Sequence, residues 1–214
     1  MKKNDTPEPF RPRRCYHVIT HHFIIDQAMT TIVYCHPYDK SFNHNILEAI
    51  TKQYTALGQE YDVINLYNEE FNPVLDTANL ALYSKGETND EKVRRYQKVL
   101  TNTRHIIFMF PIWWGMMPAM LKGFIDKVFL KGIVYDSTPE GALIPCLSIP
   151  RTTLITTSEE DSEVIAPFIT GYFTPLVLNT VGMNGVNWFN CDHVSSGTDE
   201  HRREFIDDVL KKLA

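Results

Sequence analysis

Residues 108–135 read FMFPIWWGMMPAMLKGFIDKVFLKGIVY, and this stretch decides the fold. It begins as an apolar strand that ends near Pro111, crosses a loop with two tryptophans and a glycine, and resumes as a helix behind Pro118. Proline suits the start of a helix, because an N–H at that position would be unpaired anyway. Apolar side chains then recur at helical spacing, at Met120, Leu121, Phe124, Ile125, Val128 and Phe129. The stretch therefore predicts a strand, an aromatic loop and an amphipathic helix.

The same alternation runs through the rest of the chain. Short apolar or β-branched segments at residues 30–35, 61–66, 105–110, 151–157 and 186–189 predict five strands. Helical patterns separate them, and the one at 164–178 should be broken or kinked by Pro167, Gly171 and Pro175. Strands that alternate with helices form a parallel sheet covered on both faces. We expect an α/β fold with a flavodoxin-like doubly wound five-stranded parallel sheet, in the order 2-1-3-4-5.

The first 28 residues differ from the remainder of the sequence. Prolines stand at positions 7, 9 and 12 among several lysines and arginines. Such a polar segment buries too little apolar surface to order itself. We expect residues 1–28 to be a disordered or dispensable extension, and residues 29–214 to form one domain. The histidines at 17, 21 and 22 lack converging partners, so no metal site is predicted.

Composition excludes several classes of function. The formal net charge is -5 and the chain has no cluster of lysine and arginine, which argues against nucleic acid as a partner. No apolar run approaches the ~18 residues of a membrane span, so no membrane insertion is expected. The four cysteines are scattered without a CxxC pair, which favours reduced thiols and a cytoplasmic protein.

Two unusual loops follow the first and third predicted strands, where a sheet of this order places its ligand crevice. In the first loop, Ser41 and Asn43 are good helix N-cap residues. The backbone N–H groups and the positive end of a helix then point to one place, and such a place binds anions. The second loop carries Trp113 and Trp114. Together they indicate a flat aromatic ligand with an anionic tail, such as flavin mononucleotide, and neither GxGxxG nor a P-loop is present.

Three segments resemble the successive signatures of the NAD(P)H:quinone oxidoreductase family of flavodoxin-like flavoenzymes. This family includes the mammalian quinone reductases and the bacterial drug-activity-modulator and potassium-efflux ancillary proteins. The segments are HPYDKSFNHNIL at 36–47, VINLYNEEFNPVL at 63–75 and FPIWWGMMPAMLKGFIDKVFLKGIVYD at 110–136. Their order and spacing are similar to those of the family from residue 30 to about residue 157.

The resemblance implies three flavin-binding segments. The phosphate and ribityl chain would be bound by His36, Ser41, Phe42 and Asn43. The edge of the isoalloxazine would be wrapped by Pro111, Ile112, Trp113, Trp114 and Gly115. The third flavin loop would be formed by Thr156, Thr157, Ser158 and Glu159. Family members commonly have glycines where this chain has Ser158 and Glu159. The tyrosine and histidine that mammalian members use to assist hydride transfer have no counterpart here, so no catalytic residue is assigned.

The resemblance also implies an activity. Hydride would pass from NAD(P)H through bound FMN, or alternatively FAD, to a quinone or related acceptor in a ping-pong reaction. A homodimer with the aromatic loops near its interface is expected as well. The alternative is a flavin-carrying regulatory subunit of a membrane transporter, or a small electron carrier.

Overall fold

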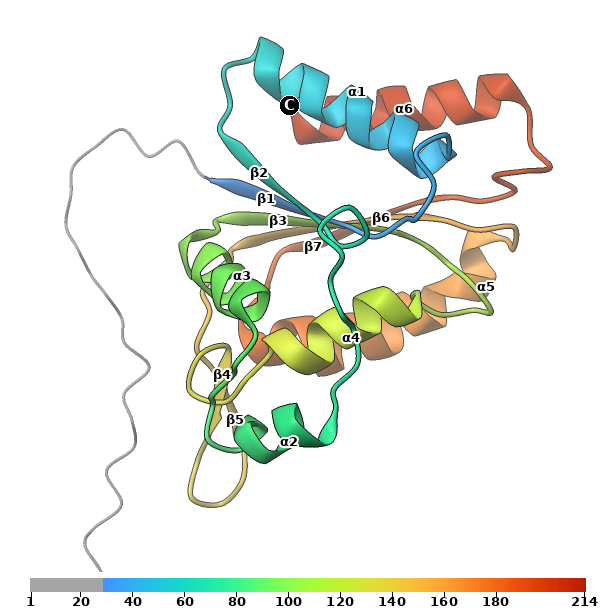
Figure 1. Cartoon of the computed structure of the whole chain (residues 1–214). Helices are drawn as coiled ribbons and strands as arrows, with labels where there is room; N and C mark the ends of the chain where they lie inside the picture. Colours follow the sequence, from blue (N-terminus) through green and yellow to red (C-terminus); the bar gives the residue numbers. More distant parts are fainter. Residues whose placement is uncertain (1–28) are drawn as a thin grey trace, which may run out of the picture.

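The computed structural model describes residues 29–214, and its centre is one parallel sheet of five strands (Figure 1). The strands are β1 (Thr30–Tyr34), β2 (Tyr61–Asn65), β3 (His105–Pro111), β6 (Arg151–Thr157) and β7 (Val186–Cys191). They lie in the order β2-β1-β3-β6-β7, so the predicted order is confirmed. Every residue of β1 and β3 is buried, which explains why apolar residues follow one another in the middle of both strands instead of alternating with polar ones.

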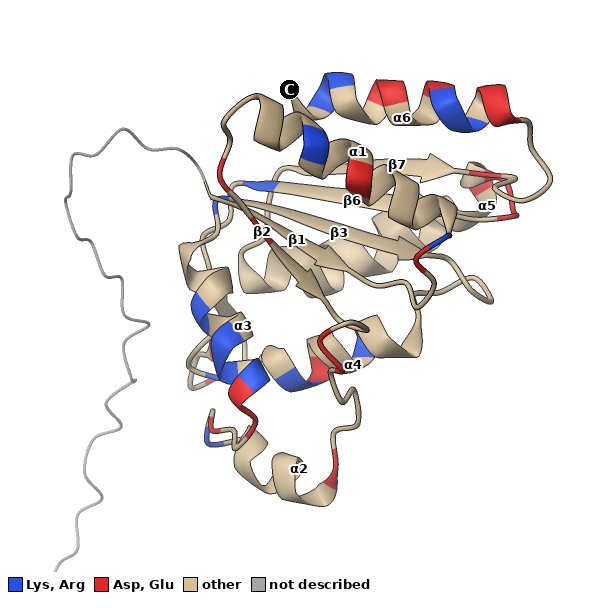
Figure 2. Ribbon diagram, turned by 45° about the horizontal axis from the view of Figure 1, so that its top comes forward, with Lys and Arg blue, Asp and Glu red and all other residues tan. Residues whose placement is uncertain are grey.

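Helices cover both faces of the sheet (Figure 1). On one face lie α1 (Phe42–Ala56) and α6 (Asp199–Leu213), over a core that contains Ile32, Met109 and Ile155. On the other face lie α3 (Glu91–Asn102), α4 (Ala119–Val128) and α5 (Ser162–Ala166). Charged residues lie on the outer sides of α1, α3 and α6, whereas the strands carry few (Figure 2). The charged surface therefore lies mainly on the helices, and the two apolar cores lie between the sheet and the helices on each of its faces.

The third strand, the aromatic loop and the following helix are present as predicted, and so are two helix caps. Ser41 caps α1 and Thr198 caps α6, each with its side chain accepting the N–H three residues on, from His44 and His201 respectively. Pro118 is the N-cap of α4, one position before the first helical residue. The glycine of this helix, Gly123, lets Pro73 of the loop after β2 approach, because a Cβ there would lie 2.3 Å from the Pro73 Cβ.

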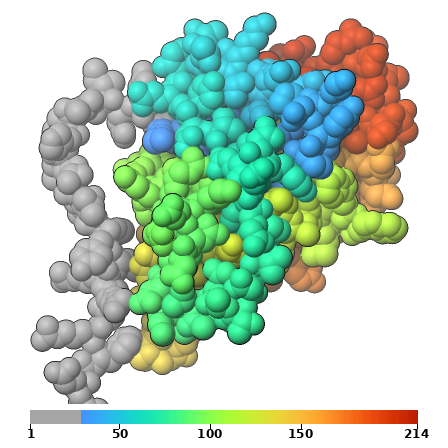
Figure 3. Space-filling model, viewed as in Figure 1, coloured from blue at the N-terminus to red at the C-terminus, as the bar shows by residue number. Residues whose placement is uncertain are grey.

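Three elements differ from what the sequence predicted. Two elements were not among those predicted: α2 (Thr77–Tyr83), and an antiparallel hairpin of β4 (Tyr135–Ser137) and β5 (Leu143–Pro145) that follows α4. In the space-filling view, α1, α2, α3 and the connection after β2 form one continuous surface (Figure 3). The helix expected to be broken or kinked at its prolines and glycine is not broken, because α5 passes into a π-helix (Pro167–Leu178) and a short 3-10 turn (Asn179–Val181). A π-helix shifts the hydrogen-bond pattern and accommodates Pro175 without a break.

This long helix also bears on the expectation about membranes. Over Ser162–Val181 it is long and apolar enough to cross a bilayer, contrary to the expectation that no such run exists, although one such helix is weak evidence of a span. The prediction of reduced thiols is confirmed for Cys35 and Cys191, which are buried and free, and is wrong for Cys146, which is disulfide-bonded. The predicted extension, residues 1–28, lies outside the described residues.

Candidate functional site

A cleft of about 600 Å³ lies at the carboxyl ends of the strands. Its walls come from the loops after β1, β3 and β6 and from the connection between β7 and α6. This is the place where an open α/β sheet binds its ligands. The cleft is lined by His36, Tyr38, Lys40, Ser41, Phe42, Asn43, Asn45, Pro111, Ile112, Trp113, Thr157, Ser158, Glu159, Val194, Ser195 and Arg202.

The amino-terminal end of α1 forms the first wall of the cleft. Ser41 Oγ accepts the N–H of His44 at 3.1 Å. The first helical N–H groups, those of Phe42 and Asn43, have no carbonyl partners inside the helix because they lie at its start. Lys40 precedes the cap and has no ion-pair partner among residues 29–214. Unpaired N–H groups, a helix dipole and an ammonium group together favour an anion.

Asn43 supplies an unpaired buried acceptor in the same wall. Its side chain is only 2% exposed, and its Nδ2 donates to Thr157 Oγ1 at 3.0 Å. Its Oδ1 has no hydrogen-bond partner. A buried polar atom without a partner is costly, so an unpaired acceptor that lines a cleft suits a ligand that brings an O–H or N–H.

His36 and Trp113 place two rings at the next part of the cleft. The ring centroids are 5.9 Å apart and the rings meet edge to face at 63°. His36 Nδ1 accepts the N–H of Tyr38 at 3.1 Å, so Nε2 carries the proton of the neutral ring. Burial lowers the pKa of His36 below its ordinary value, which keeps the ring neutral. This pair can pack against a planar ligand.

The aromatic loop is a tight turn whose second tryptophan does not line the cleft. Trp113 and Met116 exchange backbone hydrogen bonds at 2.9 and 3.1 Å. Trp114 and Gly115 between them have φ of 53° and 73°, the combination of a two-residue type I′ turn. Trp114 is fully exposed, and neither residue lines the cleft. The two amide N–H groups of this turn have no acceptor within residues 29–214, so backbone donors are available there.

The loop after β6 divides its residues between packing and cleft. Thr156 is fully buried and faces away from α1, where its Oγ1 accepts Trp188 Nε1 at 2.8 Å and donates to Asn190 Oδ1 at 2.7 Å. Thr157 faces α1 through Asn43. The N–H of Ser158 donates to Cys191 O at 2.9 Å and so is not available to a ligand. Thr156 is therefore a packing residue, whereas the three residues after it line the cleft.

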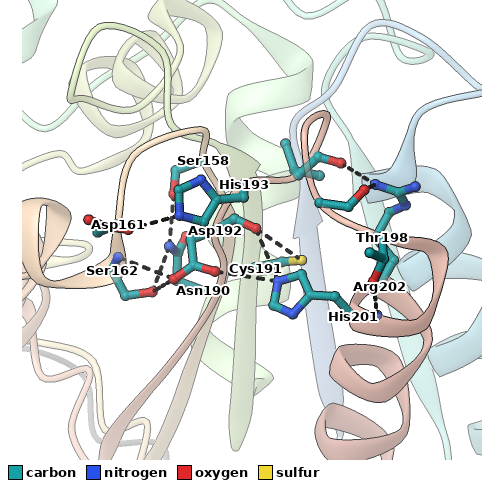
Figure 4. A network of polar contacts seen from close by, with 12 residues as sticks. Ser158, Asp161, Ser162, Asn190, Cys191, Asp192, His193, Thr198, His201 and Arg202 are labelled. Carbon is teal, nitrogen blue, oxygen red and sulfur yellow. Dashed lines mark hydrogen bonds and ion pairs between the residues drawn. The ribbon is translucent and has the colours of Figure 1, made fainter.

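A fourth wall comes from the connection between β7 and α6, which was not among the segments predicted to form the site. Val194, Ser195 and Arg202 line it. Figure 4 shows Arg202 and Thr198 on one side of this region, and Ser158, Ser162 and Asn190 on the other. A signal for this wall existed in the sequence, because Thr198 marks the start of a helix directly after the last parallel strand, and that helix start must lie at the same sheet edge.

Most of the predicted cofactor-binding residues come together in this cleft. His36, Ser41, Phe42, Asn43, Pro111, Ile112, Trp113, Thr157, Ser158 and Glu159 line it. Trp114, Gly115 and Thr156 do not. No group of three or more histidine, cysteine, aspartate or glutamate side chains suited to a metal occurs in residues 29–214. The arrangement suits a ligand with an anionic end, hydroxyl groups and a flat ring.

Comparison with known proteins identifies relatives of the same architecture. A family profile described as "Flavodoxin-like fold" matches residues 28–213. An uncharacterized NAD(P)H oxidoreductase of Escherichia coli, YcaK, is 29% identical over 105 residues, covering 49% of this chain and 54% of that protein. The mouse ribosyldihydronicotinamide dehydrogenase [quinone] is 27% identical over 121 residues, covering 49% and 52%. The chain thus spans about half the length of these curated relatives.

A solved structure covers more of the chain. Smu.1420 of Streptococcus mutans is 28% identical with a TM-score of 0.75, and the match covers 86% of this chain and 97% of that one. The names of the curated relatives agree with the family that the three sequence segments resemble.

Proposed function

The chain belongs to the flavodoxin-like fold family, and on this premise we propose that it is an NAD(P)H-dependent flavin oxidoreductase that reduces a quinone or a related acceptor. One observation carries the proposal. A single cleft combines the amino-terminal end of α1, the unpaired Oδ1 of Asn43 and the His36–Trp113 ring pair. These are complementary to the phosphate, the ribityl hydroxyls and the isoalloxazine of a flavin, in that order.

The proposed cofactor is FMN, with FAD as the alternative. Bound flavin supplies the hydride chemistry itself, taking a hydride from NAD(P)H and giving one to the acceptor. The chain binds the phosphate at the start of α1 with Ser41, Phe42 and Lys40, and Asn43 holds the ribityl chain. Among the helix caps of residues 29–214, Ser41 at the start of α1 is the one that lines this cleft, which favours the single phosphate of the mononucleotide.

A flavin ring that extends past Trp113 would meet the backbone donors of the turn after β3, at Trp114 and Gly115, which do not line the cleft themselves. The N–H groups of Trp114 and Gly115 are held in place by the Trp113–Met116 hydrogen bonds and have no acceptor of their own within residues 29–214. Donors that are already oriented stabilise developing charge without a cost of reorganisation. Because the same cleft serves both substrates, NAD(P)H leaves before the acceptor enters, and the kinetics are ping-pong.

We also propose that the protein works as a homodimer. The helix over Ser162–Val181 leaves much of its apolar surface uncovered, with Val164, Tyr172 and Leu176 each more than half exposed. Uncovered apolar surface of this kind favours a protein interface. Sedimentation of the wild type and of a Tyr172→Lys variant tests this proposal. A monomeric wild type contradicts the homodimer.

Purified full-length protein tests the activity. Heat-released cofactor is identified by mass, and oxidation of NADH and NADPH is followed with a quinone as acceptor. We expect FMN and initial-rate plots that are parallel when both substrates are varied. A flavin-bound protein without turnover by any acceptor favours the regulatory subunit or the electron carrier instead, and a protein that takes up no flavin contradicts the proposed function.

A further inference from the structure

Glu159 directs its carboxylate across the mouth of the cleft to the connection between β7 and α6. Its Oε1 accepts the N–H of Ser195 at 2.6 Å, and its Oε2 accepts the hydroxyl of Ser196 at 3.2 Å. A hydrogen bond from Ser195 is the largest effect on the pKa of Glu159 and lowers it; burial opposes this, and further bonds from Ser195 and Ser196 add to the lowering, so the net pKa is lowered. No lysine, arginine or histidine pairs with this carboxylate among residues 29–214. The negative charge of Glu159 is therefore stabilised by the hydrogen-bond donors of Ser195 and Ser196.

Arg202 holds the same connection from the other side. Its Nη1 donates to Val194 O and to Gly197 O, both at 2.9 Å (Figure 4). The segment between these two carbonyls contains the two serines that donate to Glu159. The carboxylate of Glu159 thus accepts hydrogen bonds from this short segment, and the guanidinium of Arg202 donates hydrogen bonds to its carbonyl groups. Both charged groups hold the segment in place.

The start of this segment is tied to the loop after β6 as well. The N–H of Val194 donates to Ser158 O at 3.0 Å, and the N–H of Ser158 donates to Cys191 O at 2.9 Å. We call residues 194–197 the wall segment, because Val194 and Ser195 line the cleft. It is held by backbone bonds to Ser158, by the carboxylate of Glu159 and by the guanidinium of Arg202. A glycine at position 159 would lack the two hydrogen bonds that Glu159 accepts from Ser195 and Ser196.

We propose that Glu159 is a positioning residue that fixes the wall segment, and that through this segment it retains a bound flavin without touching the cofactor. The proposal rests on the proposed function only for the identity of the ligand. The carboxylate is already engaged by two donors, and an acidic group facing a flavin would oppose the negative charge of its reduced form. The contact with the wall segment accounts for an acid at this position.

Two measurements on four variants test the inference. Hydrogen exchange of the amides at 193–198 is followed by mass spectrometry in the flavin-free protein, and the rate of FMN release is followed by the recovery of FMN fluorescence. Glu159→Ala removes both acceptors, Ser196→Ala removes one donor, and Glu159→Gln keeps an amide oxygen for Ser195. Glu160→Ala is the matched control, because it removes a neighbouring negative charge whose carboxylate has no partner within residues 29–214.

We expect Glu159→Ala to speed both the exchange of the wall segment and the release of FMN about tenfold. Glu159→Gln should restore most of the protection, Ser196→Ala should have a smaller effect, and Glu160→Ala should match the wild type. Faster release with unchanged exchange would mean that Glu159 contacts the cofactor directly, and overturns the inference. Faster exchange with unchanged release overturns it too, as does no change in either. If the wild type binds no flavin, the proposed function fails, while the exchange experiment still tests the contact between Glu159 and the wall segment.

Discussion

The amide of Asn43 donates to the hydroxyl of Thr157 at 3.0 Å and joins the first turn of α1 to the end of β6, 114 residues along the chain. This bond joins two walls of the cleft, because both residues line it, while the Asn43 Oδ1 has no partner of its own. The Asn43 side chain therefore makes a structural hydrogen bond through Nδ2, and its Oδ1 is free to accept one from a ligand.

A double-mutant cycle separates the structural role of Asn43 from its role in binding a ligand. Asn43→Ala removes a buried hydrogen bond and should lower the free energy of unfolding by about 1 to 2 kcal/mol, measured by urea denaturation without flavin. Thr157→Val should show a coupling energy with it of about 1 kcal/mol. Flavin affinity should fall more in Asn43→Ala than in Thr157→Val, because only Asn43 contributes the unpaired Oδ1. Equal losses of affinity would assign the residue to packing alone.

The cap of α1 gives a second prediction, with a control elsewhere in the chain. Ser41 Oγ and Thr198 Oγ1 each accept a backbone N–H at 3.1 Å, at the starts of α1 and α6. Replacing either by alanine should cost about 1 kcal/mol of stability. Only Ser41→Ala should weaken the binding of FMN by more than tenfold, while the binding of riboflavin, which lacks the phosphate, should change little. Isothermal titration of both flavins measures this, and a similar loss with riboflavin contradicts a phosphate at this helix end.

A buried ion pair on α4 predicts a strong effect on stability. Lys127 is 4% exposed, and its Nζ lies 2.8 Å from Asp90 Oδ2 and 2.8 Å from Asn72 O. Lys127→Met leaves a carboxylate and a carbonyl without this donor and should lower stability by about 2 to 4 kcal/mol. The control is Lys122→Met on the same helix, which breaks an exposed pair with Asp126 and should cost only about 0.3 kcal/mol.

The same pair makes stability depend on pH. Burial alone raises the pKa of Asp90, but the hydrogen bond and charge of Lys127 outweigh this, with the N–H groups of Val93 and Lys92 adding to them, and the net pKa is lowered. The stabilisation from a lowered carboxyl pKa is complete above the ordinary aspartate pKa and is lost as the pH falls through the folded value. Urea denaturation of wild type should show this acid-side loss, and Lys127→Met should reduce it.

His105 predicts a loss of stability at milder acid. It is buried at the start of β3, with Nε2 2.9 Å from Thr153 Oγ1. Burial, and to a lesser degree the charge of Arg151, lowers the pKa of His105 to about 3. Because the folded state holds the neutral ring, stability is full above the unfolded pKa of 6.5 and falls as the pH drops from there towards 3.

Between pH 7 and pH 5 this one group should cost about 2 kcal/mol. Urea denaturation at both pH values compares the wild type with His105→Gln, in which the loss should be smaller by that amount. His201→Gln, at a half-exposed histidine, serves as the control. An unchanged pH dependence in His105→Gln would mean that the ring is not held neutral.

The local sequence determined the elements that frame the cleft. The apolar segments of five strands, the helix after Pro118, and the caps Ser41 and Thr198 follow from periodicity and from the chemistry of single residues. The alternation of strands and helices then restricts the sheet to a few orders, and the observed one puts the loops after β1 and β3 side by side.

The tertiary structure alone decided which side chains of those loops face the cleft. Thr156 and Thr157 are adjacent and alike, yet successive residues of a strand point to opposite faces, so Thr156 meets Trp188 and Thr157 meets Asn43. Trp114 stands at the tip of its two-residue turn, where it is fully exposed and does not line the cleft. Glu159, Ser195 and Arg202 are brought together by contacts between segments that lie far apart in the sequence. Local periodicity reports which element a residue belongs to, whereas the partner of a polar side chain depends on what the fold places opposite it.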